Sequence, residues 1–323
     1  LKSTRTGHGV EALLNRLGSF TDEDPDWRGM EMFVDQQIRF DDARMEVVYR
    51  HFESNLRDML RVGLRHGVSM VVSTVAVNLK DCAPFGSLHR PDLTAADLQK
   101  WTNAFHHGVA AQSAQQPEVA WQHYQQALEI DGHHAELHFR LGQCALALNR
   151  AAKAHLHFAA ARDWDTLRFR CDARINEVAR RVTEDKQFKP VRLADAERSF
   201  AERSPDGVTG GAHFYEHVHL TFEGNHLLAR ILAEPVEELL AEKSLITTKP
   251  DQAWPSVADC AARLGWTDFT RLVSLRQISP RLVRPPFTGQ FDHERQLEIW
   301  QAEVSRLSAA RQPEGIAQIG RAS

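Results

Sequence analysis

The chain has 323 residues, of which 42% are hydrophobic and 25% are charged, and its formal net charge is −4. This length supports two or three domains with cores of their own, and the composition is typical of an ordinary globular protein. Lysine and arginine are interleaved with acidic residues and form no basic patch, so we expect no nucleic-acid partner.

The cysteines and the apolar runs exclude further classes. No apolar run approaches the roughly 20 residues that a membrane-spanning helix needs, so we expect no membrane span. The four cysteines are far apart and form no C-x-x-C pair, which argues against a disulfide framework or a zinc site and favours a cytoplasmic protein. They are Cys82, Cys144, Cys171 and Cys260. The chain starts at Leu1 without a charged-then-apolar leader, so we expect a processed or cut N-terminus.

Residues 1–94 are predicted to form the first segment of an α/β domain. Apolar residues recur at three- and four-residue steps over 41–66, which predicts an amphipathic helix. Residues 68–77 are a β-branched run that is apolar on both faces, typical of a buried parallel strand. The loop 78–93 would then lie at the carboxyl end of that strand, where open α/β sheets bind ligands. His89 and Arg90 are either cleft residues or ordinary surface residues of this loop.

Residues 95–168 contain an internal repeat. Similar side chains recur 34 positions apart at Gly108/Gly142, Ala120/Ala154, Tyr124/Phe158 and Ala127/Ala161. These small and aromatic positions resemble those with which tetratricopeptide (TPR) helix pairs pack closely. Two repeats are fewer than the roughly three that a stable solenoid usually needs, so we expect a TPR-like helical insertion that packs on its host domain. The resemblance implies a protein partner for this segment.

Residues 169–243 are predicted to be the last segment of the α/β domain. A helix is expected over 167–182, and a short edge strand over 189–194, because Pro190 cannot donate to a neighbouring strand. A long loop then leads to the stretch 211–225, and a closing helix is expected over 227–240. Residues 244–323 are predicted to be a helical C-terminal region without a catalytic constellation; Ser256 and Asp259 predict a capping box, and Asp292 precedes an amphipathic helix.

The stretch 211–225 gathers the candidate site residues. It holds His213, His217 and His219 together with Glu216 and Glu223. Glu216 and His219 are three residues apart, a spacing at which one short turn lets a carboxylate fix the tautomer of an imidazole, as in the base-and-orienter half of a nucleophilic hydrolase. Two other interpretations remain open. The histidines could share a metal ion, although no Cys or Asp is nearby, or His213 and His217 are solvated loop residues and His219 is a packed structural one.

The pattern Glu216-x-x-His219-Leu-Thr-x-x-Gly224 resembles the last conserved block of SGNH (GDSL-type) hydrolases, in which the acid is usually Asp. The runs 27–33, 78–89 and 254–256 are similar to those of a bacterial subgroup of SGNH-like proteins that carry TPR repeats. The resemblance implies a flavodoxin-like parallel sheet, Glu216 as orienter, His219 as general base and a substrate that bears an ester or acetyl group. It implies no cofactor.

The blocks that would complete this chemistry are absent from the sequence. There is no Gly-Asp-Ser block, and residues 67–71 lack the second glycine of a nucleophile elbow. We therefore expect this chain to be the C-terminal portion of an SGNH-type esterase or acetyl-hydrolase and to be inactive alone. The alternatives are a TPR interaction scaffold with a degenerate hydrolase-like domain, and a histidine-dependent metal protein.

Overall fold

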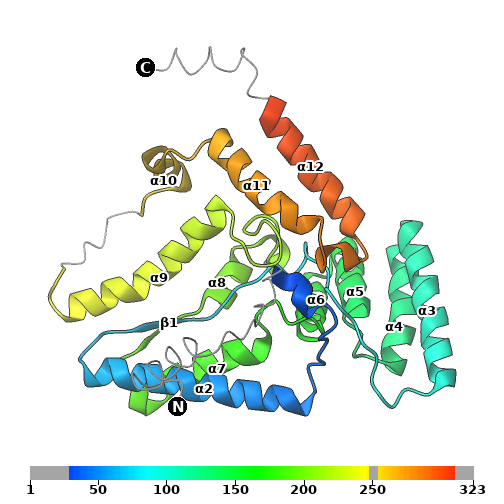
Figure 1. The fold of residues 1–323 in the computed structure, drawn as a ribbon, viewed down its shortest axis with the longest axis horizontal. Coiled ribbons are helices and arrows are strands. Elements are labelled where there is room, and N and C mark those ends of the chain that lie inside the picture. The colour runs from blue at the N-terminus through cyan, green and yellow to red at the C-terminus, as the bar shows by residue number, and fades with distance from the viewer. Residues whose placement is uncertain (1–28, 247–253, 310–323) are drawn as a thin grey trace, which may run out of the picture.

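The computed structural model describes residues 29–246 and 254–309 (Figure 1). In this part of the chain the protein is mostly helical, with a single two-stranded parallel sheet. The outer parts of the predicted segments 1–94 and 244–323 lie outside the described residues. No helix within these two ranges is long and apolar enough to cross a membrane.

The sheet joins the two predicted strand segments. Strand β1, Val71–Ser73, pairs in parallel with β2, Arg192–Ala194. The prediction of a long strand buried on both faces over 68–77 is wrong, because only three residues are strand and Val68 and Val75 are 53% and 47% exposed. A wider flavodoxin-like sheet is not seen among the described residues.

Helices cover both faces of this small sheet. Helix α2, Ala43–Arg65, and helix α7, Ala173–Glu184, pack on one face, and helices α8, Ala196–Glu202, and α9, Phe222–Glu242, pack on the other. In Figure 1, β1 runs between α9 and α2. The prediction for residues 41–66 is confirmed, and Asp42 begins α2 by accepting a hydrogen bond from the backbone N–H of Arg44.

Two other predicted helices begin elsewhere. Helix α7 starts after Asp172, whose carboxylate accepts from the Ile175 N–H (3.1 Å) and so ends the irregular loop before it. The sequence prediction of helix from residue 167 is therefore wrong over its first six residues. Helix α9 starts before the predicted residue 227, because Thr221 Oγ1 accepts from the Gly224 N–H (3.0 Å) and caps it there.

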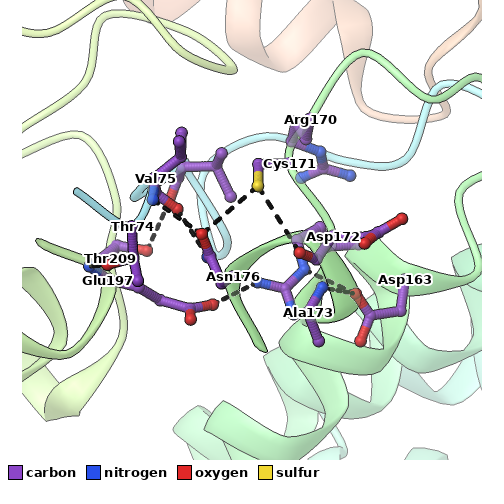
Figure 2. Close-up of polar contacts among 12 residues, drawn as sticks. Thr74, Val75, Asp163, Arg170, Cys171, Asp172, Ala173, Asn176, Glu197 and Thr209 are labelled. Atoms are coloured by element: carbon purple, nitrogen blue, oxygen red, sulfur yellow. Dashed lines mark hydrogen bonds and ion pairs between the residues drawn. The ribbon is translucent and has the colours of Figure 1, made fainter. Parts of the chain in front are cut away.

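A polar network fixes the end of β1 to α7 and α6. Asn176 of α7 accepts a hydrogen bond from the Val75 N–H (2.8 Å) and donates one to the Val75 carbonyl (3.0 Å), which ends the strand (Figure 2). The Glu197 N–H donates to Thr74 Oγ1 (2.9 Å), and Arg162 of α6 donates to the Glu197 carboxylate (2.8 Å). The helical insertion therefore packs on its host through buried charge as well as apolar contact.

The insertion consists of two helical hairpins. Its helices are α3, Ala95–Ser113; α4, Pro117–Ile130; α5, Ala135–Ala147; and α6, Ala151–Asp163. A Cβ atom at Gly108 would lie 2.5 Å from the Tyr124 ring, and one at Gly142 would lie 2.9 Å from the Phe158 ring. The glycine and aromatic positions of the predicted repeat are thus the contacts at which each hairpin closes.

The C-terminal region is helical, as expected. Helices α10, Val257–Leu264, α11, Asp268–Leu282, and α12, His293–Ala309, follow one another, and the predicted capping box of Ser256 and Asp259 is present. Four short 3-10 helices complete the described structure: η1 Gly29–Phe33, η2 Lys186–Phe188, η3 Pro205–Gly207 and η4 Phe287–Gly289.

Candidate functional site

Glu216 is the centre of the candidate site, and its carboxylate meets four N–H groups. Its Oε1 accepts from the backbone N–H of His219 (2.9 Å) and contacts His219 Nδ1, and its Oε2 accepts from the backbone N–H of His217 (2.6 Å) and contacts His217 Nδ1. Glu216 is only 6% exposed. Because a carboxylate can only accept, both Nδ1 atoms carry protons and, in each neutral ring, Nε2 is the acceptor.

The residues that follow β1 hold this loop in place. Asn78 Nδ2 donates to the Glu216 carbonyl (2.9 Å), and the Asn78 N–H donates to the His217 carbonyl (3.0 Å). Thr209 Oγ1 donates to the Val77 carbonyl (2.6 Å). The acid-His stretch therefore lies beside the loop at the carboxyl end of β1.

His217 is a core residue. It is 6% exposed, and its ring packs edge-on against the rings of Phe85 (5.4 Å) and Phe287 (5.5 Å). Burial, together with the positive charge of Arg170, lowers the pKa of His217 to about 3, so the ring is neutral. The interpretation of His217 as a solvated loop residue is therefore wrong.

His219 faces solvent on its other side. Its side chain is 47% exposed, and its Nε2 lies 3.2 Å from Nη1 of Arg281 on α11. Partial burial lowers the pKa of His219, and the Arg281 charge adds to the effect. The ring borders an open cavity of about 420 Å³. Since both ring nitrogens meet side chains, the interpretation of His219 as a packed residue bonded only to backbone is wrong.

His213 stands apart from these residues. Its ring packs against Phe200 (5.3 Å between ring centres), and its Nδ1 lies 3.2 Å from Ser204 Oγ. The Ser204 hydroxyl donates to the Phe200 carbonyl (2.7 Å) and is buried, so this serine is a structural partner of the loop. His213 does not converge with His217 and His219.

His89 and Arg90 attach their loop to the helical insertion. His89 Nδ1 lies 2.9 Å from Oδ2 of the buried Asp131, and the Arg90 N–H donates to the same oxygen (3.2 Å). The His89 ring packs edge-on against Trp101 at 4.4 Å. These contacts are structural, and neither side chain reaches the cavity beside His219.

Glu216, His217 and His219 also form a group whose possible metal-ligating atoms lie within 4.8 Å of one another. The present contacts fit a metal ion poorly, however. Both carboxylate oxygens already accept from N–H groups, both Nδ1 atoms face the carboxylate, and the guanidinium of Arg281 lies beside the outer nitrogen of His219. The arrangement suits a carboxylate that orients an imidazole.

Two residues that shape the site were not singled out from the sequence. Asn78 had one usable signal, since it is the first polar residue after the strand run. No sequence signal pointed to Arg281, because it lies 62 positions from His219 in a region whose periodicity indicates only a helix. The position of Arg281 next to His219 depends on how α11 packs over the loop that carries His219.

A second hollow, of about 570 Å³, lies where α3 and α5 meet the start of α12. The rings and aliphatic side chains in it belong to Val109, Leu146, Phe158 and Phe291, the amides to Gln112 and Gln143, and the charges to Lys80, Asp81, Arg140, Asp292 and Arg295; Ser113 completes the lining. The Arg140 guanidinium stacks on the Phe291 ring at 3.9 Å. Asp292 Oδ1 is buried without a hydrogen-bond partner.

Comparison with known proteins supports the helical insertion. The family model described as tetratricopeptide repeat matches residues 111–170. No curated protein and no solved structure matches the chain. The match overlaps the predicted repeat segment 95–168 from residue 111 onward, and TPR repeats suggest protein partners. Nothing in these comparisons supports a relationship to SGNH hydrolases.

Proposed function

We propose that the protein is an interaction protein that binds an extended segment of a partner in the hollow between α3, α5 and the start of α12. The hollow carries the proposal, because it combines apolar contact area with groups that can pair with a peptide backbone. Gln112 Nε2 donates to Gln143 Oε1 (2.8 Å), which leaves the Gln143 amide nitrogen available as a donor. The Arg295 guanidinium, whose side chain is 56% exposed, is a second donor at the same hollow.

The partner segment is expected to be extended and to carry both apolar and polar side chains. Val109 and Leu146 offer aliphatic contact area, and Lys80 and Arg295 lie at the same hollow as cations. Recognition of this kind takes its affinity from a few buried side chains and its orientation from polar groups around them.

Selection from a random peptide display library tests this function. Peptides selected on the wild-type protein should bind poorly to Gln143→Ala and Arg295→Ala, which remove a donor and a cation from the hollow. Gln122→Ala is the matched control, since Gln122 is an exposed residue of α4 that does not line the hollow. Selected peptides that bind all four proteins equally would place the interaction elsewhere.

A second function is favoured by one specific observation, the contact of the Glu216 carboxylate with Nδ1 of His219. We propose that Glu216 and His219 are the orienter and general base of an SGNH-like ester or acetyl hydrolase, in which segments 1–94 and 169–243 form one α/β domain interrupted by the insertion 95–168 and followed by the helical region 244–323. The contact of Glu216 Oε1 with Nδ1 directs Nε2 toward the cavity, as a general base requires. Loss of p-nitrophenyl ester hydrolysis in His219→Ala, measured in a form of the protein that also carries a nucleophile, tests this role.

A further inference from the structure

Arg281 differs from the other arginines of its helix. Arg271 pairs with Glu303 (3.0 Å), and Arg276 donates to Ser308 Oγ (3.2 Å). Arg281 contacts only His219 Nε2 among the described residues, and no carboxylate of that part of the chain pairs with it. An arginine with a neutral imidazole as its one partner keeps most of its five N–H donors for another acceptor.

Among the described residues, no acidic side chain lines the cavity in front of Arg281. Its lining includes Arg281, His219 and neutral polar residues, namely Tyr215, Asn225, Ser274 and Gln277. Glu216 forms no ion pair with the guanidinium, because both of its oxygens face N–H groups of the loop. The space therefore has a positive charge and several hydrogen-bond donors, the chemistry that receives an oxyanion.

We propose that this cavity, between α11 and the loop 215–225, binds the carboxylate or phosphate group of a small molecule, and that Arg281 is the residue that holds it. The planar guanidinium presents two parallel N–H groups, which match two oxygens of either group. The bound anion also takes the guanidinium away from His219 Nε2. That nitrogen is then free to accept a proton.

The anion site is separate from the peptide hollow. Only the catalytic consequence of anion binding, namely that the ligand frees His219 Nε2 to act as a base, rests on the proposed acid–base role. Binding of the anion does not depend on that role. The charged and titratable groups beside the His219 ring are Glu216 at Nδ1, Arg281 at Nε2, and His217 and Tyr215 close by.

NMR titration of the histidine ring signals with inorganic phosphate, and separately with acetate, tests the site. Sodium chloride at matched ionic strength is the blank. We expect a saturable shift of the His219 signals and a rise in the pKa of His219, because the anion neutralises the charge that disfavours the imidazolium. Arg281→Gln should weaken the apparent affinity about tenfold, since a charge-assisted hydrogen bond is lost. Arg276→Gln, on the same helix, should bind as wild type does.

The two anions separate the sources of the ligand. A response to phosphate alone assigns a phosphate-bearing molecule, and a response to acetate alone assigns a carboxylate. Equal affinity in wild type and Arg281→Gln, or a response no larger than that to chloride, would overturn the proposal. His219→Ala, followed through the Arg281 side-chain signal, should still bind the anion, so a failed acid–base role and a failed anion site give different results.

Discussion

Glu216 and His219 are joined twice, through the backbone N–H of His219 and through its Nδ1, and both contacts involve the same carboxylate oxygen. The backbone contact holds the start of the His219 side chain in position. The ring contact places the proton on Nδ1. The turn between the two residues is closed by the Tyr215 N–H, which donates to the His219 carbonyl (2.7 Å). One carboxylate oxygen of Glu216 therefore holds both the backbone and the ring of His219.

We expect Glu216→Gln to leave the fold in place and to lower the free energy of unfolding by about 1–3 kcal/mol, because an amide group cannot accept from all four N–H groups. The pKa of His219 should fall, since the imidazolium loses an opposite charge. Urea denaturation and NMR titration measure the two effects. Glu223→Gln, at an exposed position in the first turn of α9, is the control and should leave both nearly unchanged.

The 323-residue chain should show no appreciable hydrolysis of p-nitrophenyl esters. Among the described residues no serine hydroxyl is hydrogen-bonded to His219, and a base and its orienter retain little of a triad's rate enhancement. Turnover that vanishes in His219→Ala would contradict this expectation and require a nucleophile within the chain. In any form of the protein that does hydrolyse esters, Glu216→Gln should lower turnover and His219→Ala should nearly abolish it.

The helical insertion should lose stability in acid. Burial lowers the pKa of His134 to about 3 and that of His157 to about 4, and neighbouring His138 and Lys153 add to the shift at His157. Both folded-state values lie below the unfolded value of about 6.5, so stability is complete above that pH and falls as the unfolded chain gains protons below it.

Urea unfolding at pH 7.5, above the unfolded pKa, and at pH 4.5, inside the window, measures the loss of stability. The loss should approach about 1.4 kcal/mol per pH unit for each such histidine. His157→Asn should make the dependence shallower, and His51→Asn, at an exposed position of α2, should not. The same slope in the wild type and His157→Asn would assign the acid lability to other groups.

Gly142→Ala should destabilise the second hairpin. The added methyl carbon would lie 2.9 Å from the ring of Phe158, which is 1% exposed, so the ring would have to shift. Overpacking of this kind costs about 1–3 kcal/mol. Gly132→Ala meets its nearest neighbours at 3.5 Å and is the control. Equal midpoints of thermal unfolding for the two variants would show that the second hairpin accommodates the added methyl group without loss of stability.

The features predicted correctly from the sequence are those set by local spacing. The helix over 41–66, the capping box at Ser256 and the 34-residue repeat each depend on residues that meet within one helix or one hairpin. The strand over 68–77 was predicted too long, because Asn176, about 100 positions away, takes the backbone groups of Val75. Arg281 could not be found, since its approach to His219 depends on tertiary packing alone.

The central claim is that the hollow between α3, α5 and α12 binds a partner peptide, and isothermal titration calorimetry with a library-selected peptide tests it most directly. The double variant Gln143→Ala/Arg295→Ala should bind about tenfold or more weakly, a loss of about 1.4 kcal/mol, while Gln122→Ala should match wild type. Equal dissociation constants for the wild-type protein and the folded double variant would contradict the account.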